Sequence, residues 1–221
     1  MKKIIYIIMI FVGLNLQAAQ KQDDIVISAV NTLNNIMSIP ESSIPPKLLR
    51  NAKAIAIIPN VIKVGFFVGG RFGRGVLSIK QKNGRWSAPC FINLTGGSIG
   101  WQIGAQSSNI ILVFKNRSGI AGIVGGKFTL GADASVAVGP VGRNAMAGTD
   151  AGFNAAIYSY SRSKGLFLGV SLAGSSLAVN NSYNAIYYNK NVYPTDIFKG
   201  YRIKVPRSGR VFIDTIIKYT R

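Results

Sequence analysis

Apolar residues near the start of the chain recur at the spacing of an amphipathic helix. Within Asp23–Met37 they stand three or four positions apart, at Val26, Val30, Leu33 and Met37, and so share one helical face. Two acids begin the segment, where the helix dipole favours negative charge. The polar face holds Asn and Ser rather than Lys and Arg, unlike a helix that lies in a membrane interface. We therefore predict that this helix packs against the domain.

Further along, short apolar runs bounded by turn residues are typical of buried strands. Such runs occupy residues 54–58, 64–68, 98–105, 110–114, 127–138, 153–161 and 166–172. Val76–Lys82 and Arg85–Ile92 predict a hairpin, because Asn83-Gly84 between them supplies the positive φ angles of a type I′ turn. Much of the chain is therefore expected to form an antiparallel sheet.

Three more helices complete the expected fold. They cover residues 46–51, 119–125 and 208–219, the last with Ser208 as its cap. Glycines inside the strands permit the tight bends that a curved sheet needs. The pattern predicts one α+β domain, with a curved antiparallel sheet or barrel-like β core flanked by an N-terminal amphipathic helix and a C-terminal helix.

Residues 1–19 have the layout of a secretory signal peptide. Two lysines precede the apolar stretch Ile4–Leu14, and small residues follow at Ala18 and Ala19. The stretch is shorter than the roughly 20 residues of a comfortable membrane span. We predict cleavage after Ala18 or Ala19, which leaves a single domain over 20–221; an uncleaved membrane anchor is the alternative. In a bacterium with two membranes the product would be periplasmic and peripherally membrane-associated.

The composition removes much of the usual catalytic chemistry. The 221 residues include 26 Lys and Arg against 7 Asp and Glu, for a formal net charge of +19, with no His and one Cys. Without His there is no Ser–His–Asp triad and no His-based zinc site. One Cys allows neither an intramolecular disulfide nor a thiolate cluster, and Cys90 is expected to be buried. Ser161 and Lys164 have the spacing of Ser–Lys enzymes without their companion motifs. We predict a non-enzymatic protein with no metal and no cofactor.

Five collinear stretches carry a family resemblance. They are IPNVIKVGFFVGGRFGRGVL, GGSIGWQIGAQ, KFTLGADASVAVGPVGR, AGTDAGF and YSYSRSKGLFLGVSL. Together they resemble the SYLF domain family, in a secreted bacterial member whose family core covers about 42–190. The resemblance implies a lipid-binding domain, which in eukaryotic members binds phosphoinositides and in some binds actin filaments. Actin is not an expected partner of a secreted bacterial chain.

The segment Gly69–Gly75, GGRFGRG, is the first anion-binding candidate. Its glycines would expose backbone N–H groups, and Arg71 and Arg74 offer bidentate donors that suit phosphate. A β-turn or bulge with two solvated arginines is the alternative.

Further basic residues extend the predicted lipid- and anion-binding set. Lys47, Arg50 and Lys53 share a helical face before the first strand, and each cation on an anionic lipid surface gains roughly 1 kcal/mol. Three such residues give only weak, salt-sensitive attachment, so apolar insertion or an acyl-chain pocket is needed as well. The set also includes Lys127 and Arg143.

Arg143 has a structural alternative. It lies between Asp133 and Asp150 in a stretch of Gly, Ala and Val, so a buried ion pair with one of these acids competes with a headgroup contact. A later basic run has the pattern of a solvated strip, at Lys199, Arg202, Lys204, Arg207 and Arg210. Of the two tryptophans, Trp86 is expected near the surface and Trp101 in the core.

The sequence therefore predicts binding of anionic phospholipid or phosphoinositide-like headgroups at the cell envelope, with an anionic membrane surface as the partner. A protein-interaction or structural module of the envelope, with an unknown protein partner, is the alternative. No specific nucleic acid is expected, because only the pI near 10.4 suggests one and no base-reading motif is present.

Overall fold

The computed structural model describes residues 2–40, 43–126, 128–141, 155–163, 166–167 and 172–221, with side chains except at 2–19, 65–68, 98–105 and 166–167. The elements are α1 (Lys2–Met37), α2 (Pro46–Asn51), β1 (Ala54–Ile79), β2 (Cys90–Phe114), α3 (Ser118–Val124), β3 (Phe128–Thr129), β4 (Val136–Val138), β5 (Ile157–Ser163), β6 (Leu166–Phe167), β7 (Ser175–Val179), α4 (Asn181–Tyr188), α5 (Pro194–Lys199) and α6 (Arg207–Thr220).

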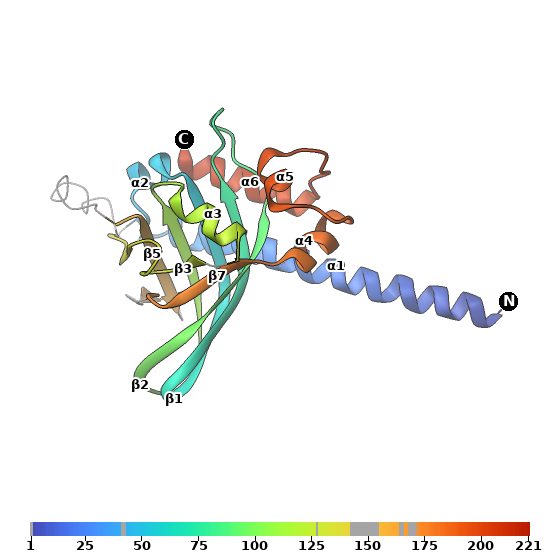
Figure 1. Ribbon diagram of the computed structural model, residues 1–221, viewed down its shortest axis with the longest axis horizontal. Coiled ribbons are helices and arrows are strands. Elements are labelled where there is room, and N and C mark those ends of the chain that lie inside the picture. Colours follow the sequence, from blue (N-terminus) through green and yellow to red (C-terminus); the bar gives the residue numbers. More distant parts are fainter. Residues whose placement is uncertain (1, 41–42, 127, 142–154, 164–165, 168–171) are drawn as a thin grey trace.

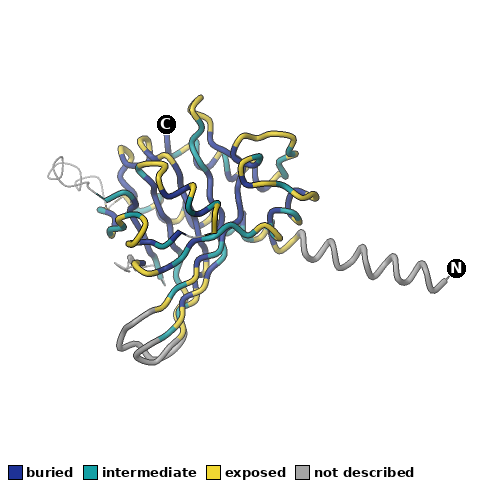
Figure 2. The backbone as a smooth tube through the Cα atoms, in the orientation of Figure 1, coloured by how far each residue is buried: buried dark blue, intermediate teal, exposed yellow. Residues whose placement is uncertain are grey.

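The strands described form one curled sheet (Figure 1). Its order is β3-β7-β2-β5-β4, with β1 paired to β2 and β6 paired to β5. Every pairing is antiparallel except that of β4 with β5. Helices α1 and α6 lie at the two ends of the chain, before and after the strands of this sheet. Buried positions are concentrated in the strands (Figure 2). The predicted α+β class with a curved sheet is confirmed.

The ribbon formed by β1 and β2 folds back on itself, so that the two halves of β1 come into contact. Its pairing runs from Ala54–Phe114 to Leu77–Cys90, with an irregularity between Gly65 and Phe67. The two halves of β1 meet at Gly75, where an added Cβ would lie 2.2 Å from the carbonyl oxygen of Ile57. Only glycine permits so close an approach of two backbone segments. We call the turning point of this ribbon the bend (Figure 1).

Several predicted boundaries are corrected. The expected strands 54–58 and 64–68 are one strand, because Pro59 and Asn60 form a bulge, with Asn60 at φ 51°, instead of ending it. Residues 98–105 and 110–114 likewise belong to a single strand, β2. Residues 127–138 hold two short strands, β3 and β4, which are separated by a turn in which Gly131 has φ 88°.

The hairpin between β1 and β2 is present, but its turn type differs from the prediction. The N–H of Gly84 donates to the carbonyl of Gln81, and the N–H of Gln81 donates to the carbonyl of Arg85. Gly84 has φ 81°, whereas Asn83 is not among the residues with positive φ. The loop is therefore a type I turn followed by a left-handed glycine, rather than a type I′ turn.

The second half of α1 packs as predicted. Val26, Ala29 and Leu33 are buried, and the Tyr219 hydroxyl of α6 donates to Asn34 Oδ1 at 2.9 Å. The helix begins at Lys2 rather than near Asp23, so it includes the segment interpreted as a signal peptide. Within the part of the chain whose side chains are described, no helix combines the length and apolar character needed to cross a membrane.

The positions of two side chains, Trp86 and Ser208, differ from the predictions. Trp86 is buried rather than near the surface, and its indole N–H donates to Thr220 Oγ1 at 2.9 Å. Ser208 does not cap α6; the helix begins at Arg207 with Pro206 before it, and the Ser208 hydroxyl donates to Asp23 Oδ1 of α1. Cys90 is buried as predicted, whereas the side chain of Trp101 lies outside those described.

Candidate functional site

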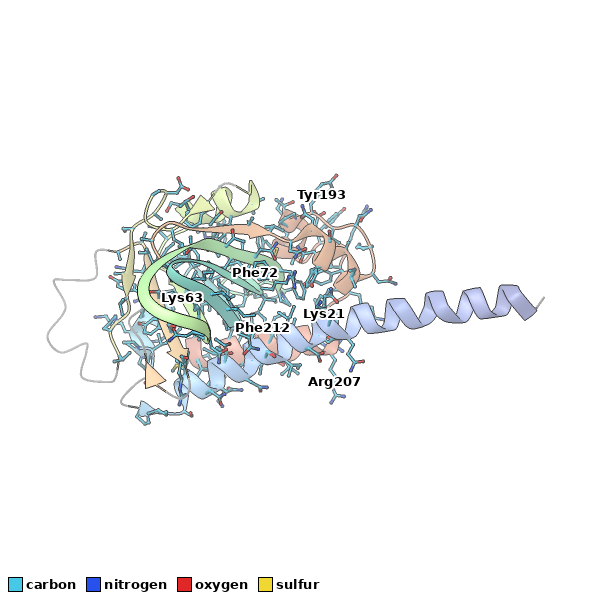
Figure 3. All side chains as sticks on the ribbon, turned by 90° about the horizontal axis from the view of Figure 1, so that it is seen from below. Lys21, Lys63, Phe72, Tyr193, Arg207 and Phe212 are labelled. Atoms are coloured by element: carbon cyan, nitrogen blue, oxygen red, sulfur yellow. The ribbon has the colours of Figure 1, made fainter. Side chains whose placement is uncertain are left out.

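A groove of about 310 Å³ lies between α1 and the folded-back part of β1. Lys21, Asp24 and Ile25 line it from the helix, and Ile62, Phe72 and Arg74 line it from the strand. Figure 3 shows α1 with Lys21 passing beside the strands that carry Phe72 and Lys63. The groove therefore joins a helix and a strand that are distant in sequence.

Unusually exposed apolar side chains surround the bend. Ile62 is 48% exposed, Val64 is 54% exposed and Phe72 is 41% exposed. Ile62 and Val64 share one face of β1, since alternate residues of a strand point the same way. Gly73 keeps the two halves of β1 together here, because a Cβ at this position would lie 2.7 Å from Val61 Cγ2. These contacts leave an apolar surface facing outward at one end of the ribbon.

Cations border this apolar surface. The Arg74 guanidinium carbon lies 4.9 Å from the centre of the Phe72 ring and 5.2 Å from that of Tyr183, so cation–π contacts hold it in place. Lys21 is exposed at the helical wall of the groove, and Asp24 is the one carboxylate among the described residues that line it. We define Ile62, Val64 and Phe72, together with Lys21 and Arg74, as the bend surface.

Arg71 has a different environment from Arg74. It is 7% exposed and donates to Ser175 Oγ of β7 at 3.2 Å, and burial lowers its pKa. The segment Gly69–Gly75 is strand, paired with residues 92–98, so the alternative of a β-turn or bulge is wrong. Anion binding by this segment stays a prediction. Alternation along β1 places Arg74 beside Phe72 on one face and Arg71 on the other.

Three further predicted basic residues, those around α2, are not brought to the groove. Lys47, Arg50 and Lys53 are exposed at the hairpin end of the ribbon, where the Lys80 ammonium donates to the Arg50 carbonyl at 3.1 Å. The Lys80 N–H likewise donates to the Lys53 carbonyl at 2.8 Å. These three cations therefore lie at the opposite end of the ribbon from the bend surface.

Three of the predicted site residues lie outside the described residues: Lys127, Arg143 and Asp150. Asp133 is exposed, and its carboxylate accepts the N–H of Thr129 at 2.6 Å within a turn. An ion pair of Asp133 with Arg143 would therefore form at the surface, and the pairing itself stays a prediction.

Comparison with known proteins places this arrangement in a family. The model of the Ysc84 family, described as Las17-binding protein actin regulator, matches residues 95–219. The chain belongs to this family. The match runs from the second strand of the bent ribbon to the end of α6, and it confirms the SYLF-type resemblance.

Similar proteins come from yeast and vertebrates. The chain is 39% identical over 185 residues to Protein YSC84 of Saccharomyces cerevisiae, which covers 80% of this chain and 39% of that protein. It is 38% identical over 162 residues to the human SH3 domain-containing YSC84-like protein 1, covering 73% of this chain and 47% of the relative. The chain thus spans less than half the length of these relatives.

Proposed function

We propose that this chain is a non-enzymatic module that binds anionic phospholipid surfaces through the bend surface. The observation that carries the proposal is that half-exposed Ile62 and Phe72 line one groove with Lys21 and Arg74. Val64, which is also exposed, lies on the same face of β1 as Ile62. Soluble proteins seldom expose large apolar side chains together, and such patches mark interaction sites.

The apolar and cationic parts contribute comparable energies. Burial of exposed apolar area gains about 25 cal/mol per Å², so burying the remaining exposed parts of Ile62, Val64 and Phe72 gains roughly 1–2 kcal/mol apiece, most of all for Phe72. Each cation at an anionic surface adds roughly 1 kcal/mol. The sum is on the order of 5 kcal/mol before orientation costs, so neither part suffices alone and binding depends on both.

The charge of the whole chain adds long-range attraction. A formal net charge of +19 draws the molecule toward an anionic surface, and salt screens this attraction with a Debye length of about 8 Å at physiological ionic strength. The layout of residues 1–19 supports export, which would make the site of action the periplasmic face of a bacterial membrane.

Flotation with vesicles of phosphatidylglycerol or phosphatidylcholine at 0.15 M salt tests the proposal. We expect binding to the anionic vesicles only, weaker by roughly tenfold or more in a Lys21→Gln/Arg74→Gln variant. The matched control is Lys204→Gln/Arg210→Gln, which removes the same two charge types from exposed positions elsewhere. Equal loss in both variants would show that net charge alone acts, and absence of binding to either vesicle would overturn the proposal.

The family description supports a second candidate, a protein-interaction module. The family is described as Las17-binding, so the bend surface of this chain would bind an acidic protein instead of lipid. Recovery of a partner from envelope extract that persists after lipid removal, without any vesicle binding, would favour this candidate.

A further inference from the structure

A second groove lies at the hairpin end of the ribbon, away from the bend. Its volume is about 520 Å³, and we call it the distal groove. Ile79 at the end of β1 and Phe198 of α5 contribute apolar surface, and Thr195 contributes a short polar side chain. At about 3.3 Å per residue, the strand from Gly69 to Ile79 places this groove on the order of 30 Å from the bend.

The charged side chains described in the lining of the distal groove are all cations. Lys82 comes from the hairpin loop, Arg117 from the residue before α3, and Lys199 from the end of α5. None of the described residues that line the groove is a carboxylate. Three separate segments therefore supply cations around an apolar floor.

Side-chain bonds to the backbone hold the walls in position. The Gln81 amide donates to the Phe198 carbonyl, which ties the hairpin loop to α5. The Arg117 guanidinium donates to the Lys80 carbonyl, which ties the start of α3 to the same loop. Because these bonds join all three segments, the groove is formed before any ligand binds, as in most small-molecule sites.

We infer that the distal groove binds a small organic anion that carries an apolar body, a site separate from the bend surface. The volume lies within the 300–1,000 Å³ that is usual for small-molecule sites. The apolar floor would take an alkyl chain or ring, while the lysines and Arg117 would hold a carboxylate or phosphate at the rim. The inference does not depend on the proposed membrane function.

Calorimetric titration of the full chain below the micelle concentration tests this inference. The probes are decanoate and decyl phosphate. Decanol is the control that has the alkyl chain without a negative charge, and inorganic phosphate is the control that has the charge without an alkyl chain. We expect saturable binding of one or both decyl anions at a single site, and much weaker binding of decanol and phosphate. The preferred decyl anion identifies the head group as carboxylate or phosphate.

Two variants locate the binding. Lys82→Gln/Lys199→Gln should weaken it about tenfold, and Thr195→Trp should block the groove while leaving every charge in place. The Lys21→Gln/Arg74→Gln variant of the bend surface should leave it unchanged, and vesicle flotation should be retained when the distal lysines are removed. Equal affinity in wild type and both distal variants, or no saturable binding of either decyl anion, would overturn the inference.

Discussion

Phe72 should dominate vesicle binding, because it is the largest apolar side chain of the bend surface. A phenylalanine presents roughly 200 Å², and 41% of Phe72 is exposed, so about 80 Å² remains to be buried. At about 25 cal/mol per Å² this area is worth about 2 kcal/mol on insertion, or roughly 30-fold in affinity. Phe72→Ala should therefore weaken binding by up to that factor, and Phe72→Leu by much less.

The assay is a flotation titration with phosphatidylglycerol vesicles, alongside thermal unfolding to confirm that each variant is folded. Tyr193 provides the matched control, since it is 76% exposed and does not line the groove. If exposed aromatic area alone drove binding, Tyr193→Ala would have the larger effect. Unchanged binding of Phe72→Ala, or an equal loss in Tyr193→Ala, would refute the reasoning.

Three further predictions concern the bend, the groove and the core. Gly75→Ala places a Cβ 2.2 Å from the carbonyl oxygen of Ile57 and should cost about 3 kcal/mol, lowering the Tm by roughly 6–12 °C in thermal scans. Gly97→Ala meets no atom within 4 Å and should shift the Tm little, so an equal effect of the two would contradict the tight packing. Asp24→Asn removes a carboxylate from the groove and should strengthen binding to anionic vesicles severalfold; weaker binding would argue against an anionic ligand there. Burial raises the pKa of the Cys90 thiol to about 12, against about 8.5 in an unfolded chain. Between pH 9 and 11 the unfolded chain therefore loses a proton that the folded chain retains, and stability falls as pH rises, by up to about 1.4 kcal/mol per pH unit from this group. Urea unfolding at several pH values should show that the free energy of unfolding falls less steeply with pH in Cys90→Ala than in the wild type. Equal slopes in the two proteins would contradict a contribution of the Cys90 thiol.

The fold class and the helices at both ends followed from local periodicity, whereas strand continuity did not. Pro59 and Asn60 are strong turn signals, yet pairing with β2 carries the strand through them as a bulge, because tertiary hydrogen bonding outweighs local preference. The elements β7, α4 and α5 were not predicted. Two of them had local signals: Asn180 accepts the N–H of Tyr183 as a helix cap, and Pro194 occupies the first turn of α5.

The candidate site was harder to predict because its parts meet only in three dimensions. Arg71 and Arg74 were grouped by sequence, but strand alternation separates them onto opposite faces. Lys21 lies far from Phe72 in sequence, and only the packing of α1 on the bent ribbon brings both to one groove. Residues 64–68 were predicted to form a buried strand, yet Val64 is 54% exposed, because no periodicity shows which apolar residues the fold leaves at the surface.

A polarity-sensitive fluorophore at residue 64 tests the central claim most directly. Natural Cys90 is buried, so a Val64→Cys variant of the folded chain can be labelled selectively, with Tyr193→Cys as the reference. On adding phosphatidylglycerol vesicles at 0.15 M salt, the label at residue 64 should shift to the blue while the label at residue 193 stays unchanged. A shift at residue 193 alone, or at neither position, would contradict membrane binding through the bend surface.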